Sequence, residues 1–121
     1  MRNLGTYFEI PVNDMDRAIK FYTHVFEVEF SKEVIHDCGM AFFPYAEGEG
    51  IRGALAKGEI YRPSIEGSLI YLTTETIDQT MAKAKELGGE ELFPKTEVPG
   101  LGFLAEFKDS EGNRIALFEK L

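Results

Sequence analysis

Residues 8–22 read FEIPVNDMDRAIKFY and join two different hydrophobic periods. The first part alternates, which is typical of a strand with one buried face; one side carries Phe8, Ile10 and Val12, and the other carries Tyr7 and Glu9. Asn13 or Asp14 follows as a helix N-cap, because a short polar side chain can accept a hydrogen bond from a free backbone N–H. The next apolar residues recur at helical spacing, which predicts an amphipathic helix to about residue 26 with a buried face of Met15, Ala18, Ile19, Tyr22 and Phe26.

Three short antiparallel strands are expected after this helix, because polar or glycine-rich breaks such as residues 47–50 separate short apolar segments. These segments lie at residues 28–33, 39–45 and 51–57. A turn-prone stretch follows at residues 58–67 and carries Pro63 and Ser64.

The second half repeats this order of elements. A strand is expected at residues 68–73, with Ile70 and Leu72 on one side and Leu69 and Tyr71 on the other. Thr76 and Gln79 predict a capping box at the start of a second helix, and Gly88-Gly89 predicts its end. The apolar face of this helix holds Ile77, Thr80, Met81, Ala84 and Leu87, and strands follow at residues 90–93, 101–108 and 113–119.

Two consecutive units of one plan predict an α+β fold of two tandem βαβββ modules. We expect one domain over residues 1–121, with the first module at about 1–58 and the second at about 66–121. Each unit alone would leave a sheet face uncovered. Two units side by side can form a curved, partly open mixed sheet with helices outside and a concave cup inside.

Composition limits the classes of function. The chain has 121 residues, of which 44% are hydrophobic, enough for one compact core. The net charge of -8 and the scattered Lys and Arg argue against nucleic acid and anionic membranes as partners. No apolar run approaches the about 20 residues that span a bilayer, and the start lacks the apolar core of a signal peptide. The single cysteine, Cys38, fits a reducing compartment, so we expect a cytoplasmic protein.

Two stretches resemble a known protein family. Residues 8–22 look like its opening pattern of an apolar strand, Val-x-Asp and a helix with Ala and Phe-Tyr. Residues 107–119, FKDSEGNRIALFE, look like its Asp-Pro-(Asp/Glu)-Gly-Asn-x-(Ile/Leu)-x-Leu ending. The chain thus resembles the glyoxalase / bleomycin-resistance / extradiol-dioxygenase family, the vicinal-oxygen-chelate superfamily. Glu27 in place of the frequent Gly, and Ser110 in place of Pro, are departures. The resemblance implies a small-molecule cup, and a homodimer.

The resemblance also implies where a metal would bind. Metal-using members of the family place a His, Glu or Gln on each of four strands, facing into the cup, to hold a divalent ion. The matching positions here are Tyr7, Ala54 (with Gly53 as the alternative), Leu69 and Ala116. Aliphatic side chains cannot donate to a metal. His24 in the first helix and His36 beside Asp37 and Cys38 read as surface and loop residues. We therefore predict no cofactor, with a divalent metal as the alternative.

The alternation also predicts which residues line the cup. We expect the concave face to hold Tyr7, Glu9, Ala54, Leu69, Tyr71, Ala116 and Phe118, and the rim to hold Arg52, Phe103 and Arg114. Such a surface fits a small, partly aromatic or apolar ligand. Glu9 is the best candidate acid or base. The alternative interpretation is purely structural: Tyr7 and Tyr71 pack together or fill a dimer seam, and Glu9 only pairs with an arginine.

Three functions remain open. The first is a metal-free small-molecule-binding protein of the resistance or sequestration type. The second is a divergent lyase, isomerase or dioxygenase-type enzyme, with an atypical metal site or with metal-free acid-base catalysis by Glu9 and Tyr7. The third is a regulatory or interaction module with a filled cup and an exposed apolar patch elsewhere.

Overall fold

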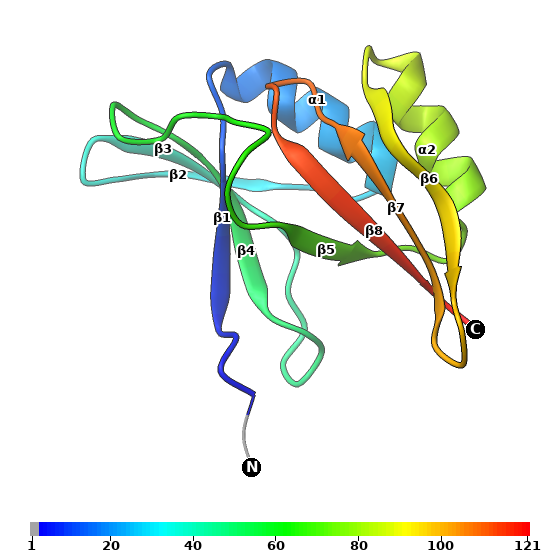
Figure 1. Cartoon of the computed structure of the whole chain (residues 1–121). Coiled ribbons are helices and arrows are strands. Elements are labelled where there is room, and N and C mark those ends of the chain that lie inside the picture. The colour runs from blue at the N-terminus through cyan, green and yellow to red at the C-terminus, as the bar shows by residue number, and fades with distance from the viewer. Residues whose placement is uncertain (1–2) are drawn as a thin grey trace.

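The computed structural model describes residues 3–121, which form two consecutive βαβββ units (Figure 1). Residues 1 and 2 of the predicted first module lie outside the described range. The first unit contains β1 (Tyr7–Pro11), α1 (Met15–Phe26), β2 (Ser31–Ile35), β3 (Cys38–Phe42) and β4 (Arg52–Lys57). The second contains β5 (Ile70–Thr73), α2 (Ile77–Glu86), β6 (Glu90–Val98), β7 (Gly102–Lys108) and β8 (Arg114–Lys120).

Each unit forms a four-stranded mixed sheet, and the two sheets have the same internal order. The orders are β1-β4-β3-β2 and β5-β8-β7-β6. In each sheet the first strand of the unit runs parallel to the last, and the remaining pairs are antiparallel. The predicted α+β fold of two tandem modules is therefore confirmed. In residues 3–121 the two sheets are separate and open, and they diverge from each other in Figure 1.

Helix α1 begins and ends where the sequence predicts. Asp14 is its N-cap, and the Asp14 side chain accepts a hydrogen bond from the backbone N–H of Arg17 at 3.0 Å. The helix ends at Phe26, and Glu27 then adopts a left-handed backbone with a φ of 54°. Glycine is common at this point because it has no Cβ to clash, so Glu27 carries backbone strain.

Helix α2 corrects one prediction. Thr76 is the N-cap, but its side chain makes no capping hydrogen bond, so the predicted capping box is wrong. Instead, the Glu119 carboxylate at the end of β8 accepts a hydrogen bond from the Ile77 N–H at 2.7 Å. A carboxylate is a stronger acceptor than a hydroxyl for this free donor. The predicted C-terminal stop is confirmed, since Gly88 has a φ of 88° and the Gly89 N–H donates to the Ala84 carbonyl at 2.8 Å.

Strand boundaries differ from expectation mainly at the sheet edges. Strand β2 begins three residues later than predicted, at Ser31, and β3 follows it through a tight turn. The turn residues His36 and Asp37 both have positive φ, 51° and 63°, as a two-residue hairpin turn requires. Strand β6 continues to Val98 rather than ending at Phe93, with two register shifts against β7. Edge strands carry few burial constraints, so their ends are weakly specified by sequence.

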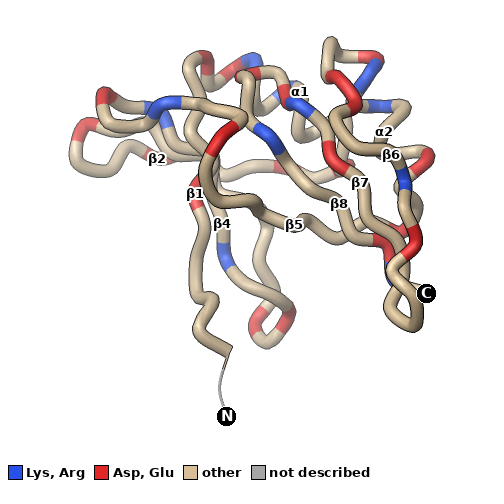
Figure 2. Tube along the Cα trace, viewed as in Figure 1, with Lys and Arg blue, Asp and Glu red and all other residues tan. Residues whose placement is uncertain are grey.

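Both units contribute to one main core on the helix side of the sheets. Ile10 and Leu55 from the first unit share this core with Phe107 and Leu117 from the second. The rings of Phe21 in α1 and Phe107 in β7 have centroids 5.9 Å apart. The helices have 12 and 10 residues, and no described helix is long and apolar enough to cross a bilayer. Lys and Arg are interspersed with Asp and Glu along the chain trace (Figure 2).

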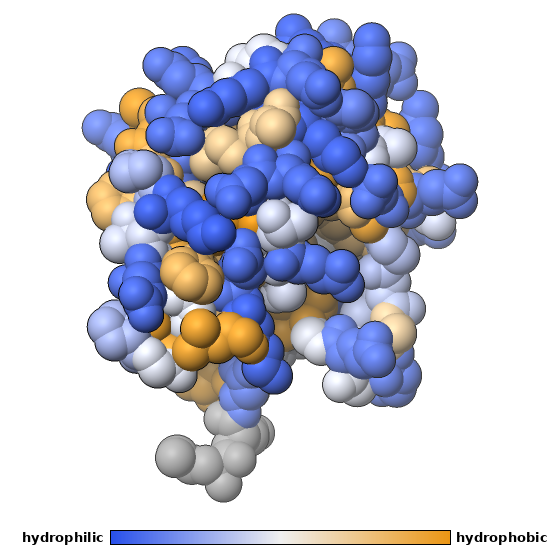
Figure 3. Space-filling model, turned by 90° about the vertical axis from the view of Figure 1, so that its right-hand side faces the viewer, coloured by the Kyte–Doolittle hydropathy of each residue, from blue (hydrophilic) through white to orange (hydrophobic). Residues whose placement is uncertain are grey.

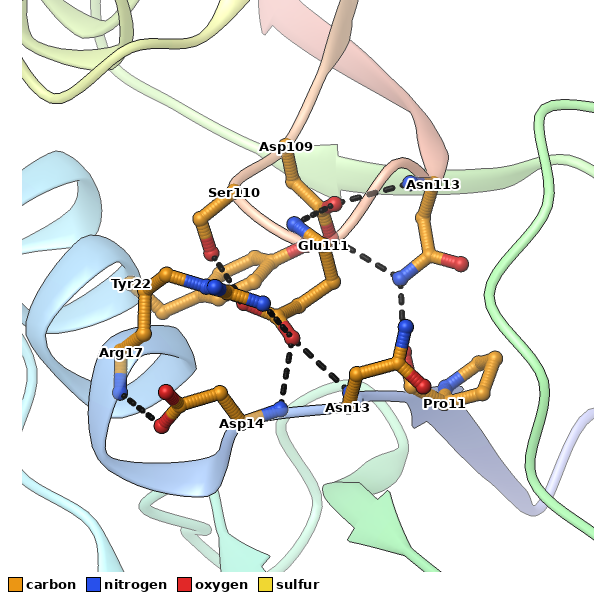
Figure 4. A network of polar contacts seen from close by, with 9 residues as sticks. All are labelled: Pro11, Asn13, Asp14, Arg17, Tyr22, Asp109, Ser110, Glu111 and Asn113. Atoms are coloured by element: carbon orange, nitrogen blue, oxygen red, sulfur yellow. Dashed lines mark hydrogen bonds and ion pairs between the residues drawn. The ribbon is translucent and has the colours of Figure 1, made fainter.

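The turn at residues 109–113 fastens the second unit to the first (Figure 4). The Glu111 side chain is 0% exposed, and its carboxylate accepts hydrogen bonds from the backbone N–H groups of Asn13 and Asp14, both at 2.8 Å. Arg17 donates to this carboxylate from Nε at 2.7 Å and from Nη2 at 3.0 Å. The Ser110 hydroxyl adds a further bond at 3.0 Å. We call these five residues the inter-module clamp.

The clamp holds a charged carboxylate inside the protein. Burial by itself raises the pKa of Glu111, but hydrogen bonds from Arg17, Asp14, Asn13 and Ser110 outweigh burial and lower that pKa to about 2. The negative charge of Glu111 at the start of α1 is also attracted by the positive end of the helix dipole. The closing motif on which the family resemblance rested is therefore a structural device in this chain.

Candidate functional site

The concave face of the first sheet carries the first candidate residues. Ile10 lies in the main core, so Tyr7 and Glu9 on the other side of β1 face away from the helices. Ala54 in β4 pairs in register with Glu9 on one side and with Phe42 on the other. Tyr7, Glu9 and Ala54 thus have the orientation that alternation predicts. Ala54 belongs to a small buried cluster with Met40 and Ala56, against which Cys38, Phe42 and Tyr61 pack.

Two tyrosine hydroxyls hold the carboxylate of Glu9. Tyr7 donates to Oε2 and Tyr61 donates to Oε1, both at 2.9 Å. Burial, together with the hydrogen bond and charge of Glu9, raises the pKa of Tyr7 to about 12. The hydrogen bond to Glu9, with some burial, also raises the pKa of Tyr61. Both phenols therefore keep their protons at neutral pH and act as donors toward Glu9.

These groups line a concave cavity of about 850 Å³. The residues that line it are Tyr7, Glu9, Ile35, His36, Asp37, Cys38, Met40, Phe42, Glu59, Ile60 and Tyr61. All of the lining residues belong to the first unit or to the segment that follows it. Sequence reasoning missed Tyr61 because it lies in a turn-prone stretch with no period to show its direction.

The concave face of the second sheet is built on the same plan. Across it, one row of paired residues runs Tyr71, Ala116, Glu106 and Phe93. Ala116 is fully buried, whereas Tyr71 is 51% exposed. Glu106 is buried and accepts a hydrogen bond from Nε of Arg114 at 2.6 Å, with Nη2 of the same guanidinium also in contact. Phe118 lies on the same side as Ala116 and is partly buried.

The predicted rim residues have three different positions. Arg52 is exposed at the start of β4, where its guanidinium lies 4.2 Å from the ring centre of Tyr45. Arg114 lies on the concave side of the second sheet. Phe103 lies on the helix side of β7. Alternate residues of a strand share a face, and Ala105 and Phe107, two and four residues further along, are core residues. The Phe103 side chain packs against the main core. Phe103 is thus not at the rim that we expected.

The single cup that we expected is divided in the monomer. A narrow pocket of about 180 Å³ brings Glu9 and Arg114 together between the two units, with Arg62 and Ser68 beside them. Leu69, which directly precedes β5, lines neither this pocket nor the 850 Å³ cavity. The same is true of Tyr71, Ala116 and Phe118. Glu9 and Arg114 are thus the predicted site residues from different modules that share a pocket, and the larger cavity is lined by no residue of the second module.

The family's metal positions do not fit a divalent ion in this chain. Ala54 and Ala116 present methyl groups, Leu69 presents an aliphatic chain, and the protonated Tyr7 hydroxyl donates a hydrogen bond to Glu9. Across residues 3–121, no three His, Cys, Asp or Glu side chains stand close enough together to hold a metal. His24 lies near the end of α1 and contacts Glu86 at 2.7 Å. His36 and Asp37 occupy the β2–β3 turn.

Two open βαβββ sheets with helices on one side, and a cavity on the concave side of the first, define a class of tandem-module proteins. A family model for the Glyoxalase/Bleomycin resistance protein/Dioxygenase superfamily matches residues 6–117. The chain belongs to this superfamily. A search of curated proteins found no match.

Solved structures with this fold come from proteins of different activities. The fosfomycin resistance protein FosX from Listeria monocytogenes has a TM-score of 0.70 and 19% identity, with 100% of this chain and 94% of that chain covered. TnmS3, an antibiotic binding protein from Streptomyces sp. CB03234, has a TM-score of 0.69 and 23% identity, with 100% and 99% covered. Glyoxalase I from Zea mays has a TM-score of 0.66 and 22% identity. The match covers 93% of this chain but 44% of the Zea mays protein. At these identities the likeness shows the shared fold.

Proposed function

We propose that this protein binds a small, partly aromatic or apolar molecule in the 850 Å³ cavity of the first sheet, and that side chains alone hold it. The observation that carries the proposal is the carboxylate of Glu9, fixed by two phenols in a cavity that apolar residues such as Met40 and Phe42 also line. Ligand sites are typically apolar hollows of this size with a few placed polar groups. The antibiotic-binding description of TnmS3 supports binding rather than turnover. The single cysteine supports a cytoplasmic location for this activity.

A second copy of the chain would complete the site. No residue of the second unit lines the 850 Å³ cavity. The concave face of the second sheet exposes 51% of Tyr71 and 39% of Phe93. Seen from the side of the second unit, hydrophobic residues gather in the lower part of the surface, around the recess between two lobes (Figure 3). Exposed apolar surface of this kind favours association. We therefore propose a homodimer in which the second sheet of one copy covers the cavity of the other.

A metal-free acid-base catalyst is the second candidate. Its support is the same pair of groups, a carboxylate that can accept a proton and a Tyr7 hydroxyl whose pKa of about 12 keeps it a proton donor. Turnover of the bound molecule, lost in Glu9→Gln while binding persists, would favour this candidate over simple binding.

Ligand screening with a matched pair of variants tests the binding proposal. Thermal shift assays would identify stabilising molecules from an aromatic fragment library, and titration calorimetry would measure their Kd with EDTA present. Tyr61→Ala removes a cavity wall and should weaken binding about tenfold or more. Tyr45→Ala removes a partly exposed tyrosine outside the cavity and should change Kd less than about twofold. Equal Kd values for both variants would refute the proposed site, and a monomer in light scattering would refute the dimer.

A further inference from the structure

The cavity of the first sheet carries negative charge without a cationic partner. Its lining includes the carboxylates of Glu9, Asp37 and Glu59, and it includes no lysine or arginine. Among the ion pairs of residues 3–121, none involves any of these three groups. The carboxylate of Glu111, in contrast, has an arginine partner within 3 Å. Arg62 and Arg114 line the narrow pocket on the other side of Glu9, but neither forms an ion pair with it. A cation inside the 850 Å³ cavity would therefore be supplied by a ligand.

The rest of the lining favours an organic cation. Tyr7, Phe42 and Tyr61 line the same cavity as Glu9, and the two tyrosine hydroxyls bond its carboxylate. Aromatic faces attract ammonium groups as well as apolar surface. Each oxygen of Glu9 accepts one phenol proton, which leaves further acceptor capacity for N–H donors. The carboxylates do not converge as the ligands of a metal ion do, because no group of three metal-binding side chains exists in the described residues.

We infer that the ligand of this cavity is a protonated organic amine with an aromatic or apolar body. The ammonium group would lie against Glu9, and the body would cover Met40 and Phe42. This inference rests on the proposed function and assigns the chemical class of the molecule that is bound. The net charge of -8 is consistent with a cationic ligand, because an acidic protein attracts cations over a longer range than direct contact.

Three probes with the same naphthalene body and different charges separate the effect of charge from that of the apolar body. 1-Naphthylmethylamine is a cation at pH 7.5, 1-naphthalenemethanol is its neutral counterpart, and 1-naphthoate is its anionic counterpart. We expect titration calorimetry at low salt to give a Kd for the amine about tenfold lower than for the alcohol, from one carboxylate contact and one ring contact. Naphthoate should bind more weakly than either. Added salt should weaken amine binding and leave alcohol binding nearly unchanged.

Two glutamate variants provide the control. Glu9→Gln keeps the size and the acceptor oxygen, so the amine and the alcohol should bind within about threefold of each other. Glu29→Gln removes the same charge from an exposed loop outside the cavity and should keep the tenfold preference. A preference for the amine that persists in Glu9→Gln would overturn the inference.

The outcomes distinguish this inference from the proposed function. Equal binding of all three probes, weakened in Tyr61→Ala, would overturn the charge preference and leave the binding site in place. Binding of none of the probes would overturn the amine inference. If the fragment screen also yields no ligand sensitive to Tyr61→Ala, the proposed function fails as well.

Discussion

Replacing Glu111 by glutamine is expected to cost the protein about 3 kcal/mol of stability at neutral pH. The ordinary pKa of a glutamate is 4.5, and in the inter-module clamp the pKa of Glu111 falls to about 2. Since one pKa unit corresponds to about 1.4 kcal/mol, the charged form contributes about 3 kcal/mol. Glutamine can still accept the backbone bonds of Asn13 and Asp14, but it offers no charge to Arg17.

The effect of Glu111→Gln should depend on pH in a defined direction. Because folding lowers the pKa of Glu111, its stabilisation is fully present above about pH 4.5 and is lost as pH falls toward about 2. Urea unfolding followed by circular dichroism at pH 7, 5, 4 and 3 would measure the wild-type and variant free energies. The difference between them should be largest at pH 7 and shrink steadily below pH 4.5.

An exposed glutamate provides the reference for this experiment. Glu29→Gln removes one charge from a loop and should change stability by less than about 0.5 kcal/mol at every pH. A loss of less than about 1 kcal/mol for Glu111→Gln at pH 7, or a loss independent of pH, would refute the assignment of a buried charged clamp.

Introducing a glycine at one position and removing one at another should change stability in opposite directions, and urea unfolding would measure both changes. Glu27→Gly should raise stability by about 0.5–1 kcal/mol, because glycine relieves the left-handed backbone and the Glu27–Lys83 ion pair is too exposed to offset this gain; a loss would contradict the strain. Gly53→Ala should cost about 1–3 kcal/mol, because its Cβ would lie 2.0 Å from Cζ of Phe8. Gly39→Ala, whose nearest neighbour would be 3.9 Å away, should cost clearly less.

Sequence reasoning predicted the direction of side chains well wherever a strand has one buried face. The alternation around Ile10 and Ile70 placed Tyr7, Glu9 and Tyr71 on the side away from the helices, because a shift of one residue would expose the whole apolar set. Helix α1 was predicted for the same reason, since its apolar stripe and its Asp14 cap agree. Order of elements and facing were therefore readable without the structure.

Other features depend on contacts between distant segments, which a local pattern does not contain. Glu119 caps α2 from β8, 42 residues further along the chain, so the local capping box did not form. Tyr61 reaches Glu9 from a stretch without periodicity, across 52 residues. The division into two sheets depends on which strands pair across the chain, and in the structure each strand pairs only within its own unit. Phe103 was predicted at the rim but packs against the main core, because the sequence did not fix which face of β7 it lies on.

The inter-module clamp also has a consequence for how the protein is made. Glu111 bonds to partners that precede it by 98, 97 and 94 residues, so its contacts close nearly the longest loop in the chain. During synthesis from the N-terminus, the amides of Asn13 and Asp14, just before α1, cannot gain this partner until Glu111 has left the ribosome. The N-terminal half should remain protease-sensitive until then, and docking of the final hairpin should be a late, slow event in folding.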